Sequence, residues 1–246
     1  MKLKYTGANV FIAGGSCNIG LVLSKLLIKE NLKPFISYRS NIGRERILES
    51  LKEYKDKFET IFLDIADNFS IKKIADVTEN IDYLVDFIQS DYETLISAAD
   101  LHRSEEYFKE NIIAKFELIK VISRKMLLRK FGRMIYISST AAKASNSGQG
   151  FYSASKLAVE ALYRNIAIEL SAKGITTVSL RLGYANTGRG KKYLEKNIEK
   201  VMEKLPSPSF LCENEIAETI LFFLSDSTKG FNATELLMDN GLTSLK

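Results

Sequence analysis

Short runs of β-branched and aromatic residues alternate along the chain with longer segments whose apolar residues recur at helical spacing. Runs such as NVFIAG at 9–14 and RMIYIS at 133–138 have the length and composition of buried strands. The pattern predicts strands at 9–14, 33–39, 58–64, 81–88, 133–138, 175–182 and 234–239, and helices near 19–30, 42–54, 68–79, 103–129, 153–172 and 213–224.

This alternation predicts the α/β fold class. Parallel strands need crossover connections, and a helix in each crossover covers one face of the sheet. We therefore expect a Rossmann-type, doubly wound, seven-stranded parallel sheet with helices on both faces. No composition shift or Pro/Gly/Ser-rich stretch divides the 246 residues, so a single dinucleotide-binding domain over 1–246 is predicted.

The regular pattern loosens at about 183–212. This stretch contains two of the three prolines and an amphipathic, charged helical segment. Because it follows the carboxyl end of a strand, where open α/β sheets bind ligands, it is interpreted as a lid or substrate loop. A plain solvated connection is the alternative.

Composition narrows the function classes. The longest apolar runs, such as 220–224, are far too short to cross a bilayer, and the amino terminus leads into a strand without a signal-peptide pattern. A cytoplasmic protein without a membrane partner is expected. Two distant cysteines, Cys17 and Cys212, and a single histidine, His102, give no zinc pattern and little support for a Ser-His-Asp hydrolase.

The chain is basic, with a net charge of +5 and a pI near 9.0, which favours acidic partners. Most basic residues are interleaved with acids, as in KEYKDK and EKNIEK, and this is typical of a solvated surface. Nucleic-acid binding rests on the pI alone, and we expect no nucleic-acid partner.

Residues 13–20, AGGSCNIG, form a glycine-rich turn between the first strand and the first helix. Such a turn lets backbone N–H groups approach a pyrophosphate beside the positive end of a helix, with Gly14 and Gly20 as supports. A tight connection without a ligand has the same pattern. Arg39, at the end of the second strand, is suited to a ribose 2′-phosphate, so NADP (NADPH) is favoured over NAD. An exposed arginine at a strand end is the alternative.

Tyr152 and Lys156 are four residues apart at the start of a predicted helix, so their side chains share one face. Lowering a phenol pKa from about 10 to about 7 requires roughly 4 kcal/mol, of which a nearby ammonium can supply much. Tyr152 could then exchange a proton with a carbonyl or alcohol oxygen while a hydride moves to or from a nicotinamide.

The chain resembles the short-chain dehydrogenase/reductase family, in its small single-domain form, over nearly its whole length. Tyr152 to Lys156 fit the YxxxK motif, Ser139 precedes the tyrosine by 13 residues, and Asn111 fits the helix asparagine. The resemblance implies that Tyr152 is the acid/base and that Ser139 orients the substrate oxygen. Lys156 would bind the cofactor ribose and lower the tyrosine pKa, and Asn111 would hold a relay water. Among family members, the chain is most similar to 3-oxoacyl-carrier-protein reductases.

The resemblance also implies a set of cofactor-binding residues. These are Gly14, Ser16, Asn18, Ile19, Gly20, Arg39, Asp64, Ile65, Phe87, Tyr152, Lys156 and Thr187.

Three positions depart from the family pattern. Asn18 replaces the middle glycine of the turn, and asparagine tolerates the positive φ that the turn is expected to need. Leu182 replaces a proline. Residues 86–89, DFIQ, replace the family's NNAG and are expected to narrow the cofactor space, to reshape the pocket or to stop cofactor binding.

Two functions remain open. The first is an NADP(H)-dependent oxidoreductase that transfers a hydride between nicotinamide and a carbonyl or alcohol substrate, with 3-oxoacyl thioesters among the candidates. Arg129, Lys130 and Lys173, expected near the site, would suit an acidic carrier protein or a coenzyme A ester. The alternative is a non-catalytic cofactor-sensing or assembly protein, motivated by the DFIQ segment.

The resemblance further implies a homotetramer or homodimer, assembled through the helices at 103–129 and 153–172 and the last strand. Apolar residues recur at helical spacing on both helices and would serve either the core or a subunit interface. They are Phe116, Ile119, Ile122, Leu162, Ile166 and Leu170.

Overall fold

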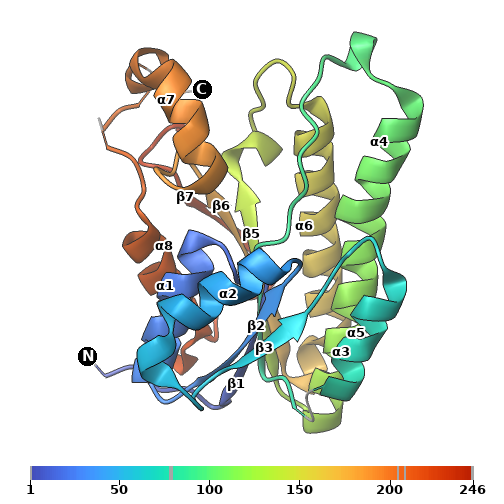
Figure 1. Ribbon diagram of the computed structural model, residues 1–246, viewed down its shortest axis with the longest axis vertical. Coiled ribbons are helices and arrows are strands. Elements are labelled where there is room, and N and C mark those ends of the chain that lie inside the picture. Colours follow the sequence, from blue (N-terminus) through green and yellow to red (C-terminus); the bar gives the residue numbers. More distant parts are fainter. Residues whose placement is uncertain (1, 78–79, 204, 208, 245–246) are drawn as a thin grey trace.

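The sheet of the protein is parallel and seven-stranded, as predicted, in the order β3-β2-β1-β4-β5-β6-β7 (Figure 1). The computed structural model describes residues 2–77, 80–203, 205–207 and 209–244. The strands are β1 (Asn9–Ala13), β2 (Lys33–Tyr38), β3 (Glu59–Phe62), β4 (Tyr83–Asp86), β5 (Gly132–Ser139), β6 (Ile175–Leu182) and β7 (Thr234–Met238).

Helices connect successive strands, and two further helical segments follow β6. Within the described residues the α-helices are α1 (Asn18–Lys29), α2 (Asn41–Ser50), α3 (Asn68–Val77), α4 (Leu101–Phe108), α5 (Ala114–Arg129), α6 (Gly150–Leu170), α7 (Gly188–Met202) and α8 (Glu213–Leu224). None of these described helices combines the length and apolar character needed to cross a bilayer.

The sheet separates two layers of helices, as Figure 1 shows: α1, α2 and α8 cover one face, and α3, α5 and α6 cover the other. Because both faces are covered, the central strands are apolar throughout, and Val10 to Ala13 of β1 have no exposed surface. β1 pairs with β2 on one side and β4 on the other, so the strand order reverses between β1 and β4. Ligands of open α/β sheets bind beyond the carboxyl ends of the strands at this switch point.

The long helix predicted at 103–129 is not continuous. α4 passes into a π-helical turn, Lys109–Ile113, before α5 begins. The side chain of Asn111, inside this turn, donates to the carbonyl oxygen of Tyr107 at 2.8 Å, so a side-chain contact accompanies the wider turn. The predicted helix at 68–79 is α3, and its expected last residue, Glu79, lies outside the described residues.

The segment predicted as a lid contains α7 and has apolar contacts of its own. A small buried cluster is formed by Leu194, Val201, Leu205 and Leu242. Tyr184 and Tyr193 pack against this cluster and stack on each other, with their ring centres 5.8 Å apart. The two ends of the segment are joined, because Leu211 donates its backbone N–H to the carbonyl of Tyr184 at 3.1 Å. It is therefore more than a plain solvated connection, although Lys204 and Pro208 lie outside the described residues.

The apolar residues shared by the α5 and α6 helices divide between two roles. Ile119 and Ile122 are buried in the core. Phe116, Leu162, Ile166 and Leu170 line a shallow cavity of about 310 Å³ between the two helices, together with Ile119. Assembly through this face stays a prediction.

Candidate active site

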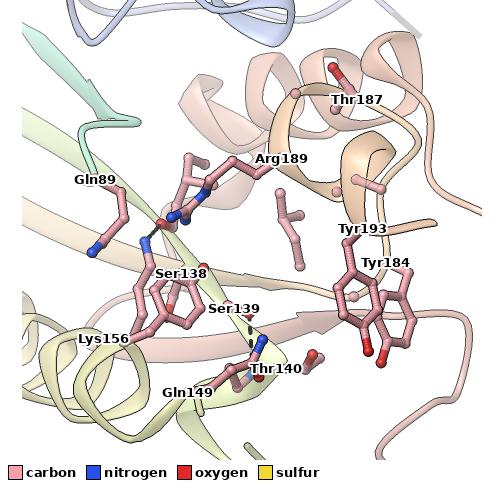
Figure 2. Close-up of a pocket in the computed structure, with 18 of the residues that line it drawn as sticks. Gln89, Ser138, Ser139, Thr140, Gln149, Lys156, Tyr184, Thr187, Arg189 and Tyr193 are labelled. Atoms are coloured by element: carbon pink, nitrogen blue, oxygen red, sulfur yellow. Dashed lines mark hydrogen bonds between the residues drawn. The ribbon is translucent and has the colours of Figure 1, made fainter. Parts of the chain in front are cut away.

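A cleft of about 1050 Å³ lies at the carboxyl edge of the sheet, beneath α7. Its walls come from the glycine-rich turn, from the end of β5, from the first turns of α6 and from the lid (Figure 2). Among the predicted site residues, Asn18, Ile19, Phe87, Ser139, Tyr152, Lys156 and Thr187 line it.

The two serines at the end of β5 have different roles. The Ser138 hydroxyl donates to Glu160 Oε1 at 2.6 Å, and this carboxylate is in turn held by Arg181. Ser139 Oγ accepts the Ala141 N–H at 3.1 Å and also hydrogen bonds with Tyr152. Because the Ser138 hydroxyl is committed to an internal partner, Ser139 is the serine placed to contact a substrate.

The expected lowering of the Tyr152 pKa is not found. Burial raises the pKa of Tyr152 to about 12, and the hydrogen bond from Ser139 only partly opposes this. Lys156 Nζ lies 5.6 Å from the centre of the Tyr152 ring and donates to the Ile137 carbonyl at 2.8 Å. Burial, together with the charge of Lys115, lowers the pKa of Lys156 to about 7, so its ammonium provides little positive field.

The buried Lys156 predicts a dependence of stability on pH. Its folded pKa of about 7 lies below the usual value of 10.5, so the unfolded chain binds more protons between these limits. The penalty for burying the ammonium is complete below pH 7 and is relieved as pH rises towards 10. Between pH 7 and pH 9, the free energy of unfolding of wild type should therefore rise by about 2–3 kcal/mol relative to that of Lys156→Met, as measured by urea unfolding. The prediction is contradicted if the free energies of unfolding of wild type and Lys156→Met change in parallel with pH. The control Lys120→Met, at a partly exposed position on α5, should follow wild type in parallel.

Asn111 lies behind the cleft and does not line it. Its Oδ1 accepts the Gln89 side-chain amide at 2.8 Å and the Ser90 backbone N–H at 2.9 Å. The Gln89 amide also donates to the Tyr107 hydroxyl at 2.8 Å. The asparagine thus ties the segment after β4 to the π-helical turn, and its role in holding a relay water stays a prediction.

The DFIQ segment leaves the cleft open. Ile88 is partly buried and packs against the core cluster that α3, α5 and α6 cover, whereas Phe87 and Gln89 form part of the cleft wall. Asp86 is fully buried, forms an ion pair with Lys115 and accepts the Tyr163 hydroxyl at 3.0 Å. The segment therefore reshapes the site without filling it.

Within the glycine-rich turn, the positive φ is found at Gly14 and not at Asn18. Gly14 carries the positive φ, +74°, and a Cβ there would lie 3.2 Å from the Ile88 side chain. Asn18 does not have a positive φ. It begins α1, and its side chain donates to Glu213 at 3.0 Å and accepts from Arg46. The expectation that asparagine was tolerated for its φ was wrong, because the position needs helical backbone.

Six predicted cofactor residues lie outside the cleft wall: Gly14, Ser16, Gly20, Arg39, Asp64 and Ile65. Arg39 has 69% of its side chain exposed, and its Nε lies 3.9 Å from Asp64 Oδ1. Ile65 is buried beside them. The structure brings Arg39 and Asp64 together at the end of the sheet that the sequence assigned to the adenosine.

One residue of the site was not found from the sequence. Arg189, in the first turn of α7, places its guanidinium 5.0 Å from the centre of the Tyr152 ring and forms an ion pair with Asp91. Nothing in the local sequence distinguishes this arginine from the other basic residues of α7.

The sequence profile of the family described as short chain dehydrogenase matches residues 8–198. The chain belongs to the short-chain dehydrogenase family. It is 27% identical to the 3-oxoacyl-[acyl-carrier-protein] reductase FabG of Rickettsia prowazekii, over 98% of both chains. Among solved structures, levodione reductase aligns with a TM-score of 0.92 at 21% identity, covering 99% of this chain and 100% of that one. A gluconate 5-dehydrogenase from Burkholderia cenocepacia, in complex with NADP and tartrate, aligns at 0.89 and 20% identity, over 98% and 97%.

As a short-chain dehydrogenase, the chain is an oxidoreductase of a family that uses nicotinamide cofactors, and its cleft fits such a group. Asn18 of the glycine-rich turn and Thr187 both line the cleft, and its volume is at the upper end of those that hold small ligands. Ser139 and Tyr152 also line the cleft, and their hydroxyl groups supply polar contacts for a ligand.

The basic residues expected to recruit an acidic carrier are not near this site. Lys130 lies just before β5 and Lys173 just before β6, at the amino ends of these strands. Arg129 forms an ion pair with Asp82, which precedes β4, at 3.3 Å. Because the strands are parallel, all three lie at the sheet edge opposite Ser139 within one chain.

Proposed function

We propose that this short-chain dehydrogenase is an NADP(H)-dependent enzyme that moves a hydride between nicotinamide and a carbonyl or alcohol group. The observation that carries the proposal is the juxtaposition of Ser139, Tyr152 and Lys156 on one wall of a cleft that begins at the glycine-rich turn. A nicotinamide, when bound, supplies or accepts the hydride. Lys156 and Thr187 would hold its ribose and carboxamide ends.

The hydroxyls of Ser139 and Tyr152 would hold the substrate oxygen. Because burial keeps Tyr152 protonated at neutral pH, its O–H can donate to the oxygen on which negative charge develops during carbonyl reduction. Ser139 donates to the same oxygen and fixes its position. Alcohol oxidation needs the phenolate instead, so the reverse reaction is expected to accelerate as pH rises.

The preference for NADP rests on Arg39. Charge-assisted hydrogen bonds to a 2′-phosphate contribute about 1.5–3 kcal/mol, so Arg39→Ala should weaken NADPH binding roughly tenfold to a hundredfold. NADH binding should change by less than about threefold, because NADH carries no 2′-phosphate. Calorimetry with both nucleotides measures this, with Arg164→Ala as a matched control: Arg164 is a partly exposed arginine paired to Glu235 on the far side of the sheet. Equal losses for NADPH and NADH would remove Arg39 from the phosphate site.

The first substrates to test are 3-oxoacyl thioesters, because similar proteins are named as 3-oxoacyl-[acyl-carrier-protein] reductases. A panel of acetoacetyl thioesters, β-ketoesters and quinones, followed by NADPH oxidation, tests the proposal. The same proposal includes an acyl-carrier protein as the partner that presents the acyl thioester. It also includes a homotetramer or homodimer, a single domain with a lid at 183–212, and a cytoplasmic location.

A non-catalytic, cofactor-sensing role is the second candidate, and the DFIQ segment supports it. Gln89 engages Asn111 directly and so occupies the amide that the family resemblance assigns to catalysis. Tight NADPH binding without oxidation by any compound of the panel would favour this candidate over the enzyme.

A further inference from the structure

Arg189 lies in a tight turn at the start of α7, over the ring of the proposed catalytic tyrosine. A Cβ on the next residue, Gly190, would lie 2.2 Å from the Ala185 carbonyl oxygen, so only glycine permits the close approach that begins α7. The Arg189 side chain extends from the lid towards Ser138 and Lys156 (Figure 2). Its guanidinium lies 5.0 Å from the centre of the Tyr152 ring, and both residues line the cleft.

The lid wall of the cleft is cationic. Lys192 and Lys196 follow Arg189 at helical spacing, and both line the cleft. The acidic residues of the cleft, Asp91 and Glu93, come from the segment after β4 and not from α7. Within the described part of the chain, the ion pair found for Arg189 is with Asp91, whose side chain is 66% exposed. The guanidinium therefore already holds a carboxylate, and one that solvent or a ligand can replace.

We propose that the cleft takes carbonyl substrates that carry their own carboxylate one or two carbons from the reacting carbon, and that Arg189 anchors this carboxylate. The inference rests on the proposed reductase function and names its substrate class as 2-oxo and 3-oxo acids. An arginine binds a carboxylate through two parallel hydrogen bonds, which a neutral ester or amide cannot reproduce. The short span between the guanidinium and the Tyr152 ring, 5.0 Å, limits the separation of the two groups on the substrate.

The reaction leaves the carboxylate unchanged. A hydride with its electron pair adds to the carbonyl carbon, the C=O π bond breaks, and the Tyr152 proton passes to the oxygen. The products are the hydroxy acid and the oxidised nucleotide, and solvent returns the proton to Tyr152. Anchoring by Arg189 would fix the carbonyl between Ser139 and Tyr152.

The test compares acids with amides of the same shape. Acetoacetate with acetoacetamide, and 2-oxobutyrate with 2-oxobutyramide, are assayed by NADPH oxidation with wild type and Arg189→Gln. Wild type should favour the acid of each pair in kcat/KM by at least about tenfold. Arg189→Gln should lose roughly tenfold to a hundredfold on the acids and less than about threefold on the amides. Equal losses on both, or a wild-type preference for the amides, would overturn the proposal.

A binding measurement separates this proposal from the catalytic one. Protein saturated with NADP⁺ is titrated with acetoacetate, a pair that cannot react, and the heat of binding is recorded. Arg189→Gln should abolish measurable binding, whereas Arg103→Gln should preserve it. Arg103 is a matched control because it also lies over a tyrosine ring, Tyr92 at 5.8 Å, and pairs with an acid, Glu106, but does not line the cleft. Binding that is insensitive to Arg189 would refute the anchor. Binding that depends on Arg189, without oxidation of NADPH by any substrate, would refute the hydride transfer alone.

Discussion

Tyr152→Phe is expected to lower kcat/KM for carbonyl reduction by two to four orders of magnitude, the usual contribution of a positioned general acid. The substitution removes one oxygen atom and keeps the buried ring, so the core around α6 and the cleft shape should be unchanged. Steady-state NADPH oxidation measures the loss, and calorimetry with NADPH should show binding within about threefold of wild type.

Tyr184→Phe is the matched control for this experiment. Tyr184 also lines the cleft, and its ring stacks on Tyr193 of the lid, away from Ser139. It should retain activity within a few-fold. If Tyr152→Phe kept full activity, the proton would have another source. If neither wild type nor variant turned over any substrate, the cofactor-sensing role would be the better account.

Lys115→Met is expected to produce the largest loss of stability among the substitutions considered. Lys115 and Asp86 are fully buried and form an ion pair between α5 and the end of β4. Removing the ammonium leaves a fully buried carboxylate whose remaining hydrogen bonds come from two neutral donors, the Tyr163 hydroxyl and the Ile88 backbone N–H. Breaking a buried pair of this kind costs about 3–5 kcal/mol in the free energy of unfolding.

Urea unfolding of four proteins tests this prediction. The double variant Asp86→Asn/Lys115→Met should recover much of the lost stability, because it leaves no isolated charge. Lys120→Met removes a lysine from the same helix, where it pairs with Glu117 at a partly exposed position, and should cost less than about 1 kcal/mol. A Lys115→Met loss no larger than that of Lys120→Met would show that the pair is accessible to water in solution.

The strands and most helices could be predicted because their apolar periodicity is local. β6 and α8 have the predicted bounds: Gly174 and Gly183 flank β6, and the apolar run of α8 ends at Leu224. The break between α4 and α5 could not be predicted, because Asn111 bonds to Ser90, which is distant in the sequence. The start of α6 at Gly150 was also missed, because small residues around Tyr152 have no periodicity.

The site was predictable where spacing along one element decides the geometry, and not where a distant partner does. Ser139, Tyr152 and Lys156 meet because a strand end and the next helix place them together. The burial of Lys115 is understood from its ion pair with Asp86, which is 29 residues earlier in the sequence. Asn18 likewise contacts two residues that are distant in the sequence, Arg46 and Glu213. The pKa of Lys156 likewise depends on how deeply the folded chain buries it, and spacing alone gave the wrong direction for Tyr152.

The apolar cluster beneath α7 has a practical consequence. Leu242, close to the carboxyl terminus, packs with Leu194 and Val201 of the lid helix, whereas the amino-terminal residues lie at the opposite edge of the sheet (Figure 1). A substitution that weakens the packing of Leu242 would therefore also loosen α7, whose residues line the cleft. An affinity tag at the amino terminus lies at the opposite edge of the sheet and keeps clear of this packing.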